Sequence, residues 1–408
     1  MKNKLILSLL CTLAWALPTQ AQPSEPSLCI KGEGATDMIW TWWFYPQVIT
    51  HNDVTFWTFA TKDGYSGIAQ ADKKSLCVKK TMLRRTHADD HNGMAFVIMD
   101  DGRLLCSYAG GHNIDNKIHI RLSKKPYSID EFEDAITLVS NGKQTTYSQI
   151  LHVKDTYYLF YRVNNKTWVV RTTKDGRSWS EETTLVTAPV QYYCKVMPTT
   201  DNNLIRICMY SNPQSKPGFD TRIRMGFLRL NDMHLLNADA KTDVGTDHID
   251  YRTFNVIIDN EPNKIQRMFD VAVSAPDDPR VLFCTFSTDD NSTYMLHSKA
   301  GNRKICNGGL SFWRPKYQGG ASFLNANTIV LSREEKGYDH IETYMFDNNR
   351  IDRQKEFLRE SIGPDTTHRN IRPICDINGK DFVWQCGYYD FTGFVNFNMN
   401  TRFSFVNY

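Results

Sequence analysis

Four side chains capable of acid–base or charge-stabilising chemistry fall at the ends of strand-like runs. His91 lies in the stretch Ala-Asp-Asp-His-Asn-Gly, just before an apolar run that begins at Ala95, and His112 follows the next run. Tyr147 and Arg162 occupy the matching places around the following pair of runs. Because a hairpin returns the chain to the end at which it started, each pair should lie at one end of one hairpin. The two hairpins would then direct two histidines, a tyrosine and an arginine at one patch.

These residue types suit the β-elimination of a uronic acid. Ordinary glycoside hydrolysis uses two Asp or Glu residues that flank the bond, and no such pair is evident in the sequence. In β-elimination a base removes the proton at C5, beside the carboxylate, and an acid protonates the oxygen that leaves C4. An arginine fork offsets the growing charge of the carboxylate. Tyrosine has an ordinary pKa of about 10, so it needs a nearby cation such as Arg162 to act as a base.

Seven segments share one pattern, in which an apolar run, a polar turn, an aromatic-rich run and a further run follow one another. They are Pro46 to Asp72, Ala95 to Ser123, Tyr147 to Thr173, Cys194 to Leu230, Met268 to Lys299, Gly319 to Asp347 and Arg372 to Asn398. Their starts are 47 to 53 residues apart, except for one interval of 74. A four-stranded propeller blade needs about 40–50 residues. The repeats therefore predict an all-β fold, a single seven-bladed β-propeller with four-stranded antiparallel blades.

Smaller features refine this prediction. The stretch Thr172–Trp179 resembles, one residue short, the Asp-box turn of sialidase-like propellers, and it falls where the third and fourth strands of a blade should join. Apolar runs around Met38 to Phe44 and at Arg402 to Tyr408 are left over, and we expect one of them to complete the blade of the other so that no sheet edge stays open. Only Ser128 to Ala135 has the pattern of a helical turn.

The N-terminal 21 residues have the pattern of a secretory signal peptide. Lys2 and Lys4 precede an apolar run from Leu5 to Leu17, and Thr-Gln-Ala before Gln22 offers a cleavage site. We expect residues 22–408 to form the propeller domain of an exported protein, periplasmic or secreted. Loss of the two lysines lowers the formal net charge from +3 to +1. A nearly neutral chain with no later apolar run long enough to span a bilayer is predicted to bind no nucleic acid and to cross no membrane.

The cysteines and most aromatic side chains are predicted to belong to the core. The nine cysteines after the signal segment form no CxxC pair, so no zinc site is predicted. Most of them lie in apolar runs, where cysteine behaves as a small hydrophobe. The aromatic pairs Trp42-Trp43, Tyr192-Tyr193 and Tyr388-Tyr389 suit sugar stacking, although large rings dominate buried contacts in general.

At the four reactive residues the sequence resembles the seven-bladed propeller lyases. The stretches Asp-His-Asn-Gly, Gly-Gly-His, Thr-Tyr-Ser-Gln and Phe-Tyr-Arg around these residues are similar to the motifs of the ulvan lyases, polysaccharide lyase families 24 and 25. They are more similar to polysaccharide lyase family 42 and glycoside hydrolase family 145, which act on L-rhamnose-α-1,4-D-glucuronate ends of arabinogalactan. The resemblance implies that His91, His112, Tyr147 and Arg162 are catalytic, and that Asn92 and Tyr210 bind the sugar.

One residue departs from the family 145 pattern. Rhamnosidases of that family use a histidine of the first blade on the opposite face of the propeller, and the matching position here is Gln47. Glutamine cannot exchange a proton, so the resemblance favours a lyase that acts on a rhamnose-capped glucuronate of an acidic plant saccharide and leaves an unsaturated uronate. An α-L-rhamnosidase and a non-catalytic carbohydrate-binding propeller stay as alternatives. We expect a monomer that requires no cofactor or catalytic metal; no EF-hand-like loop supports a structural calcium ion.

Overall fold

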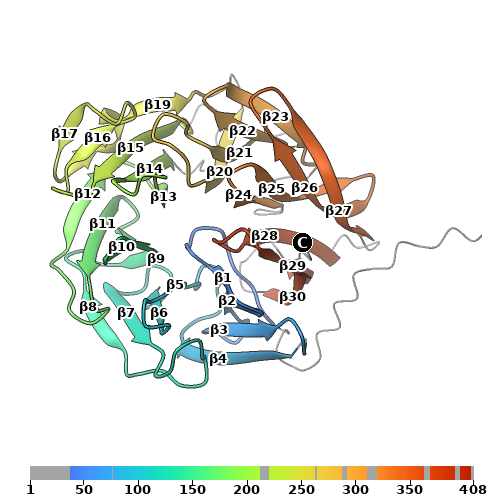
Figure 1. Ribbon diagram of the computed structural model, residues 1–408, viewed down its shortest axis with the longest axis horizontal. Coiled ribbons are helices and arrows are strands. Elements are labelled where there is room, and N and C mark those ends of the chain that lie inside the picture. The colour runs from blue at the N-terminus through green and yellow to red at the C-terminus, as the bar shows by residue number, and fades with distance from the viewer. Residues whose placement is uncertain are drawn as a thin grey trace, which may run out of the picture.

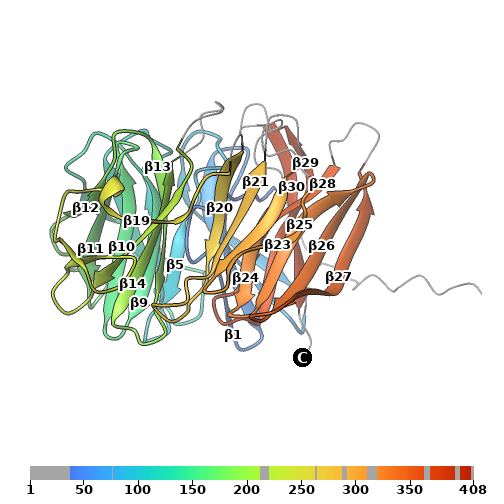
Figure 2. The ribbon, with the colours of Figure 1, turned by 90° about the horizontal axis from the view of Figure 1, so that it is seen from above.

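The chain folds into a ring of seven blades around a central channel (Figure 1). The computed structural model describes residues 37–405 except 76, 212–219, 262–263, 287–291, 310–318, 363–367 and 391–395, so the predicted signal peptide lies outside the described residues. The innermost strand of each blade comes first in the chain, and the two strands that follow it lie progressively farther out. Seen from the side, the blades stand next to one another in a disc (Figure 2). The predicted seven-bladed β-propeller is confirmed.

The first four blades occupy the chain up to residue 258. Blade 1 contains β1 (Val48–His51), β2 (Val54–Ala60), β3 (Tyr65–Asp72) and β4 (Val78–Arg85). Blade 2 contains β5 (Ala95–Ile98), β6 (Leu104–Ala109), β7 (Lys117–Leu122) and β8 (Ile136–Val139). Blade 3 contains β9 (Thr145–Val153), β10 (Thr156–Val163), β11 (Thr167–Thr173) and β12 (Thr183–Thr187). Blade 4 contains β13 (Tyr192–Pro198), β14 (Leu204–Ser211), β15 (Ile223–Arg229), β16 (Leu235–Asn237), β17 (Asp243–Gly245) and β19 (Asn255–Ile258), while β18 (Ile249–Asp250) joins blade 3.

The remaining three blades close the ring. Blade 5 contains β20 (Ile265–Val271), β21 (Val281–Phe286), β22 (Thr293–Ser298) and β23 (Gly301–Asn307). Blade 6 contains β24 (Gly320–Asn325), β25 (Thr328–Glu335), β26 (Tyr338–Phe346) and β27 (Ile351–Ser361). Blade 7 has three described strands, β28 (His368–Cys375), β29 (Asp381–Asp390) and β30 (Asn396–Phe405). The extra strands of blade 4 account for the one long interval between repeats.

Burial follows the position of each strand in its blade. The inner strands β14 and β20 are buried along their whole length because neighbouring blades cover both of their faces. The outer strand β7 alternates between buried and accessible side chains, as expected for a half-covered strand. All eight cysteines that the structure describes are free, and all but Cys77 and Cys306 are buried. The prediction that cysteine serves mainly as core is therefore confirmed for these residues.

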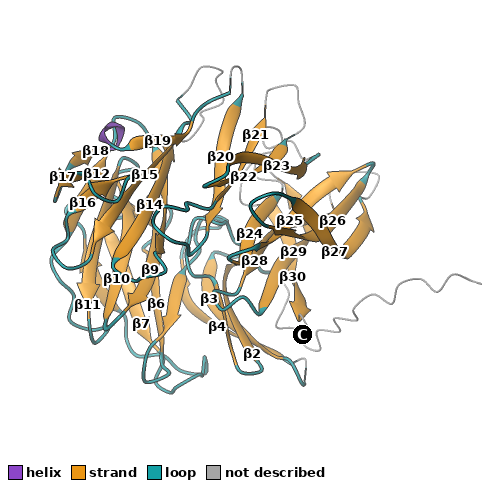
Figure 3. Cartoon of the chain, turned by 45° about the horizontal axis from the view of Figure 1, so that its top comes forward, coloured by secondary structure: helices purple, strands orange, loops and turns teal. Residues whose placement is uncertain are grey.

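Two predicted elements are wrong. The segment from Met38 to Phe44 is not a strand: its backbone pairs with Ala60 of blade 1 only through Ile39, and it then turns into the channel. Ser128 to Ala135 has no helix, because Phe132 forms an isolated bridge with Ser123 instead. In the described chain, the only helix is a single 3-10 turn at Tyr251–Thr253, drawn in purple in Figure 3.

The N-terminal segment ties distant blades together across the channel. Met38 donates a backbone hydrogen bond to Met399 of blade 7 at 2.9 Å. Farther along, the carbonyl of Tyr45 accepts from the backbone N–H of Ile150 in blade 3 at 2.8 Å. Because the segment crosses from blades 7 and 1 to blade 3, its side chains fill the middle of the ring and form the floor beneath the residues described next.

The Asp-box-like turn lies where it was predicted, between β11 and β12. Asp175 accepts backbone hydrogen bonds from Arg177 at 2.8 Å and from Ser178 at 2.7 Å, and the indole of Trp179 donates to the carbonyl of Gly176 at 3.3 Å. These bonds stabilise a tight connection at the outer edge of blade 3.

Candidate active site

The four predicted residues converge at the face where the innermost strands begin, which we call the histidine face. His91 precedes β5, and His112 follows β6, so the hairpin of blade 2 brings both to that face. Their imidazole rings stack, with centroids 4.6 Å apart and planes 14° from parallel. The hydroxyl of Tyr147, from blade 3, lies 3.5 Å from Nε2 of His112. Sequence reasoning therefore located the cluster correctly.

A β-bulge aims Tyr147 into the cluster. Pairing between β9 and β10 shifts between Phe160 and Arg162, so that Tyr147 and Ser148 together oppose one residue of β10. Tyr147 has a φ of 53°, in the left-handed region that non-glycine residues rarely adopt. Bulges and positive-φ residues cluster at functional sites, where they redirect a side chain at the cost of backbone strain.

Arg162 lies behind this tyrosine as a buried cation. Its guanidinium carbon is 4.4 Å from the ring centroid of Tyr147 and 4.8 Å from that of Tyr193, and Nη2 donates to the side chain of Asn165 at 2.7 Å. The residue is fully buried, and Nε and Nη1 have no hydrogen-bond partner among the described residues. No described carboxylate lies within ion-pair distance of it. Two N–H donors of this buried guanidinium thus have no protein partner among the described residues.

Asp89 holds both histidines in place. One of its carboxylate oxygens lies 2.8 Å from Nδ1 of His91, and the other lies 3.0 Å from Nδ1 of His112. A carboxylate can only accept, so Nδ1 of His112 carries a proton and Nε2 of the neutral ring carries the lone pair that faces Tyr147. The same arrangement orients the histidine of a Ser-His-Asp triad.

The two histidines differ in charge. Burial disfavours the charged form of His91, but the carboxylates of Asp90 and Asp89 outweigh it and raise the pKa of His91 to about 10. For His112, burial is the largest effect and lowers its pKa, although the hydrogen bond to Asp89 opposes the shift and the positive charge of His91 adds to it. At neutral pH, His91 is therefore an imidazolium and His112 a neutral base.

Blade 7 supports His91 from across the channel. Asp90 lies 2.5 Å from Nδ1 of His91, and its other oxygen accepts from Arg372 at 2.8 Å and from the hydroxyl of Tyr389 at 2.6 Å. A second bulge directs Arg372 inward, with a φ of 52°. The pKa of Asp90 is lowered, because the charges of His91 and Arg372 outweigh its burial. Two carboxylates (Asp89 and Asp90) balance two cations (His91 and Arg372). Arg162 is therefore the cation of this cluster whose charge is not balanced.

Aromatic rings form the floor of the cluster. Trp43, from the N-terminal segment, stacks on Tyr193 with ring centroids 4.3 Å apart and lies 5.8 Å from the ring of Tyr210 and 6.3 Å from that of Tyr147. All of these rings are buried. His112 is the most accessible of the four predicted catalytic residues, with 22% of its side chain exposed.

The side chain of Asn92 is hydrogen-bonded at both of its polar atoms, so it positions its neighbours and is not free to bind a sugar. Its carbonyl oxygen accepts from the backbone of His112 at 2.8 Å, and its amide donates to the carbonyl of His87 at 2.7 Å. Sequence reasoning missed the roles of Asp89, Asp90, Arg372 and Tyr389. The two aspartates stand directly before His91, which was a usable signal, whereas nothing local marks Arg372 or Tyr389 as members of this cluster.

The donor atoms of Asp89, His91 and His112 lie within 4.8 Å of one another and could hold a metal ion. Ligation by His91 requires a lone pair on its ring nitrogen, and the two carboxylates beside it favour the imidazolium, which has none. The arrangement suits proton transfer better than metal binding.

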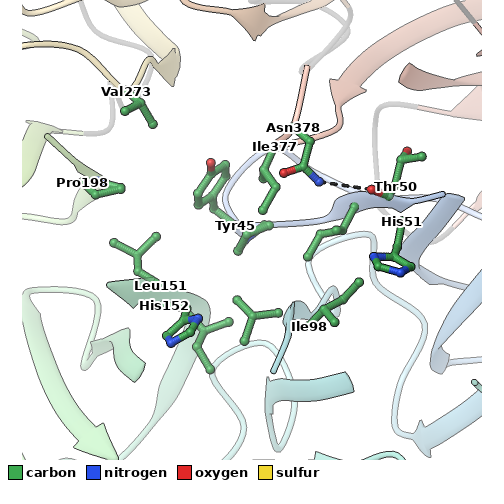
Figure 4. A pocket seen from close by; sticks show the side chains of 14 residues that line it. Tyr45, Thr50, His51, Ile98, Leu151, His152, Pro198, Val273, Ile377 and Asn378 are labelled. Carbon is green, nitrogen blue, oxygen red and sulfur yellow. Dashed lines mark hydrogen bonds between the residues drawn. The ribbon is translucent and has the colours of Figure 1, made fainter. Parts of the chain in front are cut away.

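The opposite face, where the innermost strands end, has a separate cavity of about 350 Å³ (Figure 4). His51 and His152 lie on its wall, and Asn378 donates to the carbonyl of Thr50 at 3.1 Å. Gln47, the predicted opposite-face candidate, does not line this cavity. It is buried deeper in the channel, beside Lys195 and Asp270.

Comparisons with known proteins agree with this architecture. The model of a family described as "BNR repeat-containing family member" matches residues 54–306. No curated protein matches the sequence. An ulvan lyase of polysaccharide lyase family 25, solved with -[GlcA(1-4)Rha3S]- bound, is similar with a TM-score of 0.68 and 11% identity over 90% of this chain and 93% of its own. The polysaccharide lyase Uly1 is similar with a TM-score of 0.58 and 11% identity over 89% and 91%. At these identities the likeness establishes the shared fold.

Proposed function

The chain belongs to the BNR repeat-containing family, and on that premise we propose that it is a polysaccharide lyase that cleaves L-rhamnose-α-1,4-D-glucuronate ends by β-elimination. The products would be free rhamnose and an uronate with a double bond between C4 and C5. The proposal joins the chemistry of the histidine face to a fold that ulvan lyases share.

The observation that carries this proposal is the unpaired Arg162. Burying a cation without a partner is costly, and proteins accept it where a ligand supplies the opposite charge. Each of its partnerless N–H groups can donate one charge-assisted hydrogen bond to a carboxylate oxygen. A uronate bound here places C5 near Tyr147 and His112, and the guanidinium then stabilises the negative charge that grows on the carboxylate as the C5 proton leaves.

The proton transfers follow from the state of His112. Its Nε2 lone pair is the base that removes the C5 proton, and the hydroxyl of Tyr147 donates to the oxygen leaving C4. In D-glucuronate the C5 hydrogen and the C4 oxygen project from the same side of the ring. A base and an acid 3.5 Å apart suit such a syn elimination, and the same contact returns the proton from His112 to Tyr147 afterwards.

His91 keeps His112 ready for this role. Its imidazolium stacks on the ring of His112, so a second positive charge there is unfavourable and His112 stays neutral. Asp89 fixes the tautomer, and Asp90 with Arg372 fixes the imidazolium. None of these groups needs to move during the reaction, which is the condition for preorganised catalysis.

The choice of a rhamnose-capped glucuronate is supported by the motif resemblance around the four catalytic residues. The bound saccharide of the ulvan lyase structure also joins glucuronate to a rhamnose derivative, though that observation concerns the other protein. The predicted N-terminal signal supports an exported enzyme that meets such saccharides outside the cytoplasm.

The requirement for the carboxylate can be tested with a matched pair of substrates. One is a rhamnosyl-α-1,4-glucuronide, and the other is the same compound with its carboxyl group reduced to the alcohol. We expect cleavage of the glucuronide with a rise in ultraviolet absorbance, and no cleavage of the reduced compound. Equal cleavage of both would mean that Arg162 does not recognise a carboxylate, and binding of the glucuronide without cleavage would favour a non-catalytic propeller.

A further inference from the structure

A second cluster of reactive side chains lies at the junction of blades 6 and 7, separate from the residues of the histidine face discussed above. Glu360 comes from the outermost strand of blade 6, β27, whereas His368 and Cys386 come from β28 and β29 of blade 7. Their donor atoms lie within 4.8 Å of one another. Cys386 is buried, and the other two side chains are partly accessible.

The distances fit one tetrahedral metal ion. Cys386 Sγ lies 3.4 Å from Nε2 of His368, and the same nitrogen lies 3.6 Å from a carboxylate oxygen of Glu360. Zinc bonds of about 2.3 Å to sulfur and about 2.0 Å to nitrogen or oxygen place tetrahedral ligands roughly 3.3–3.8 Å apart. In a Cys-His-Glu catalytic triad, one ring nitrogen of the histidine would contact the cysteine and the other would contact the glutamate. Here one nitrogen faces both partners, as a shared central ion requires.

The scaffold around these ligands is rigid. Asn370 pairs with Cys386 across the β28–β29 ladder, so His368 lies diagonally across from Cys386 on the same sheet face. The side chain of Asn370 accepts from the indole of Trp384 at 3.1 Å and donates to Glu360 at 2.8 Å. Such outer hydrogen bonds orient the ligands of metal sites.

We propose that Glu360, His368 and Cys386 bind a zinc ion, with water in the fourth position. A thiolate, an imidazole and a carboxylate are the ligand types that zinc takes in proteins. Binding replaces the thiol proton of Cys386 with the metal and releases that proton to solvent, so affinity increases with pH. Arg402, which lies 3.0 Å from the same carboxylate oxygen of Glu360, competes with the ion and limits its affinity.

The position of the site suggests what the ion does. Blade 7 closes the ring and has three described strands, whereas every other blade has at least four. An ion held by β27, β28 and β29 joins the last blade to its neighbour at this seam. The site would thus stabilise ring closure, independently of the elimination reaction proposed above.

The test measures metal directly. Protein purified without chelator is analysed for zinc, and apoprotein is titrated with Co²⁺, whose bond to a thiolate produces a charge-transfer band in the near ultraviolet. We expect one ion per chain, a cobalt–thiolate band, and a melting temperature that rises by a few degrees with zinc.

The variants Cys386→Ser and His368→Gln should lose the ion and the zinc-dependent rise in melting temperature. Cys375→Ser, the same change at a buried cysteine of the same blade, should retain both. Arg402→Gln should tighten binding, because it removes the competing cation. A native protein without a cobalt–thiolate band, or a His368→Gln variant that binds zinc as the native protein does, would overturn the proposal. His368 is partly accessible, so its variant should fold even if Cys386→Ser does not.

Discussion

Replacement of Arg162 by lysine separates the effect of its positive charge from the effect of its planar guanidinium, whose N–H groups donate in fixed directions. Arginine can donate from Nε or from Nη1 to a carboxylate oxygen while Nη2 donates to Asn165. Lysine keeps the charge but presents one compact ammonium, so the fixed donor direction of the planar guanidinium is lost. Loss of one preorganised donor costs about 10²–10³ in rate, or roughly 2.7–4 kcal/mol of transition-state stabilisation. We expect kcat/KM of Arg162→Lys to fall by this factor, and Arg162→Met to be at least as impaired.

Stability should respond much less than activity. Arg162→Met removes two cation–π contacts worth about 0.5–2 kcal/mol each and one charge-assisted hydrogen bond worth about 1.5–3 kcal/mol. It also relieves the burial of an unpaired charge, which costs several kcal/mol. These effects oppose one another, so the melting temperature should change by only a few degrees.

The assay follows ultraviolet absorbance on a rhamnosyl glucuronide, with thermal unfolding measured on the same samples. Asn165→Ala is the matched control, because it removes the partner of Nη2 without touching the two free donors, and it should retain most activity. A lysine variant within threefold of the native rate would refute the reasoning. So would an inactive methionine variant that is also unfolded, since Arg162 would then be structural.

Three further outcomes are expected. Tyr147→Phe removes one hydroxyl and should lower the elimination rate by about 10²–10⁴ with an unchanged melting temperature; a fully active variant would exclude it as the acid. Gln47→Ala should leave the elimination rate unchanged because Gln47 lies in the channel, and an inactive, folded variant would move catalysis away from the histidine face. His91 has a pKa of about 10 in the folded protein and about 6.5 unfolded, so its contribution is complete below pH 6.5 and is lost as pH rises through 10. The free energy of unfolding, measured by denaturant titration at several pH values in this window, should decrease with pH by up to about 1.4 kcal/mol per pH unit because of His91. His91→Gln should lack this decrease, and the same pH dependence in both proteins would contradict the assignment.

The fold was predictable because its information is repeated along the chain. Seven turns rich in Asn, Asp and Gly divide apolar runs at nearly constant intervals apart from one longer interval, and the structure places each of them between the first two strands of a blade. The segment at Met38 to Phe44 was not predictable in the same way. Its apolar residues fit a strand as well as a channel filler, and only the assembled ring provides the surfaces on which Trp43 stacks.

The candidate site was predictable where hairpins determine it. His91, His112, Tyr147 and Arg162 occupy matching places in two successive hairpins, so local geometry brings them together. Arg372 is 282 residues from Asp90 and reaches it across the channel from a bulge with positive φ. Neither the distance nor the bulge has a signature in the sequence, because both arise from closure of the ring.

The measurement that tests the central claim most directly is the ratio of two products. A rhamnosyl-α-1,4-glucuronide is incubated with the native protein and with Tyr147→Phe, while free rhamnose and ultraviolet absorbance are followed together. Elimination at the histidine face predicts one conjugated double bond for each rhamnose released by the native protein, and loss of both signals in the variant. Rhamnose released without absorbance would show hydrolysis instead, and would contradict the assignment of Arg162, His112 and Tyr147 to β-elimination.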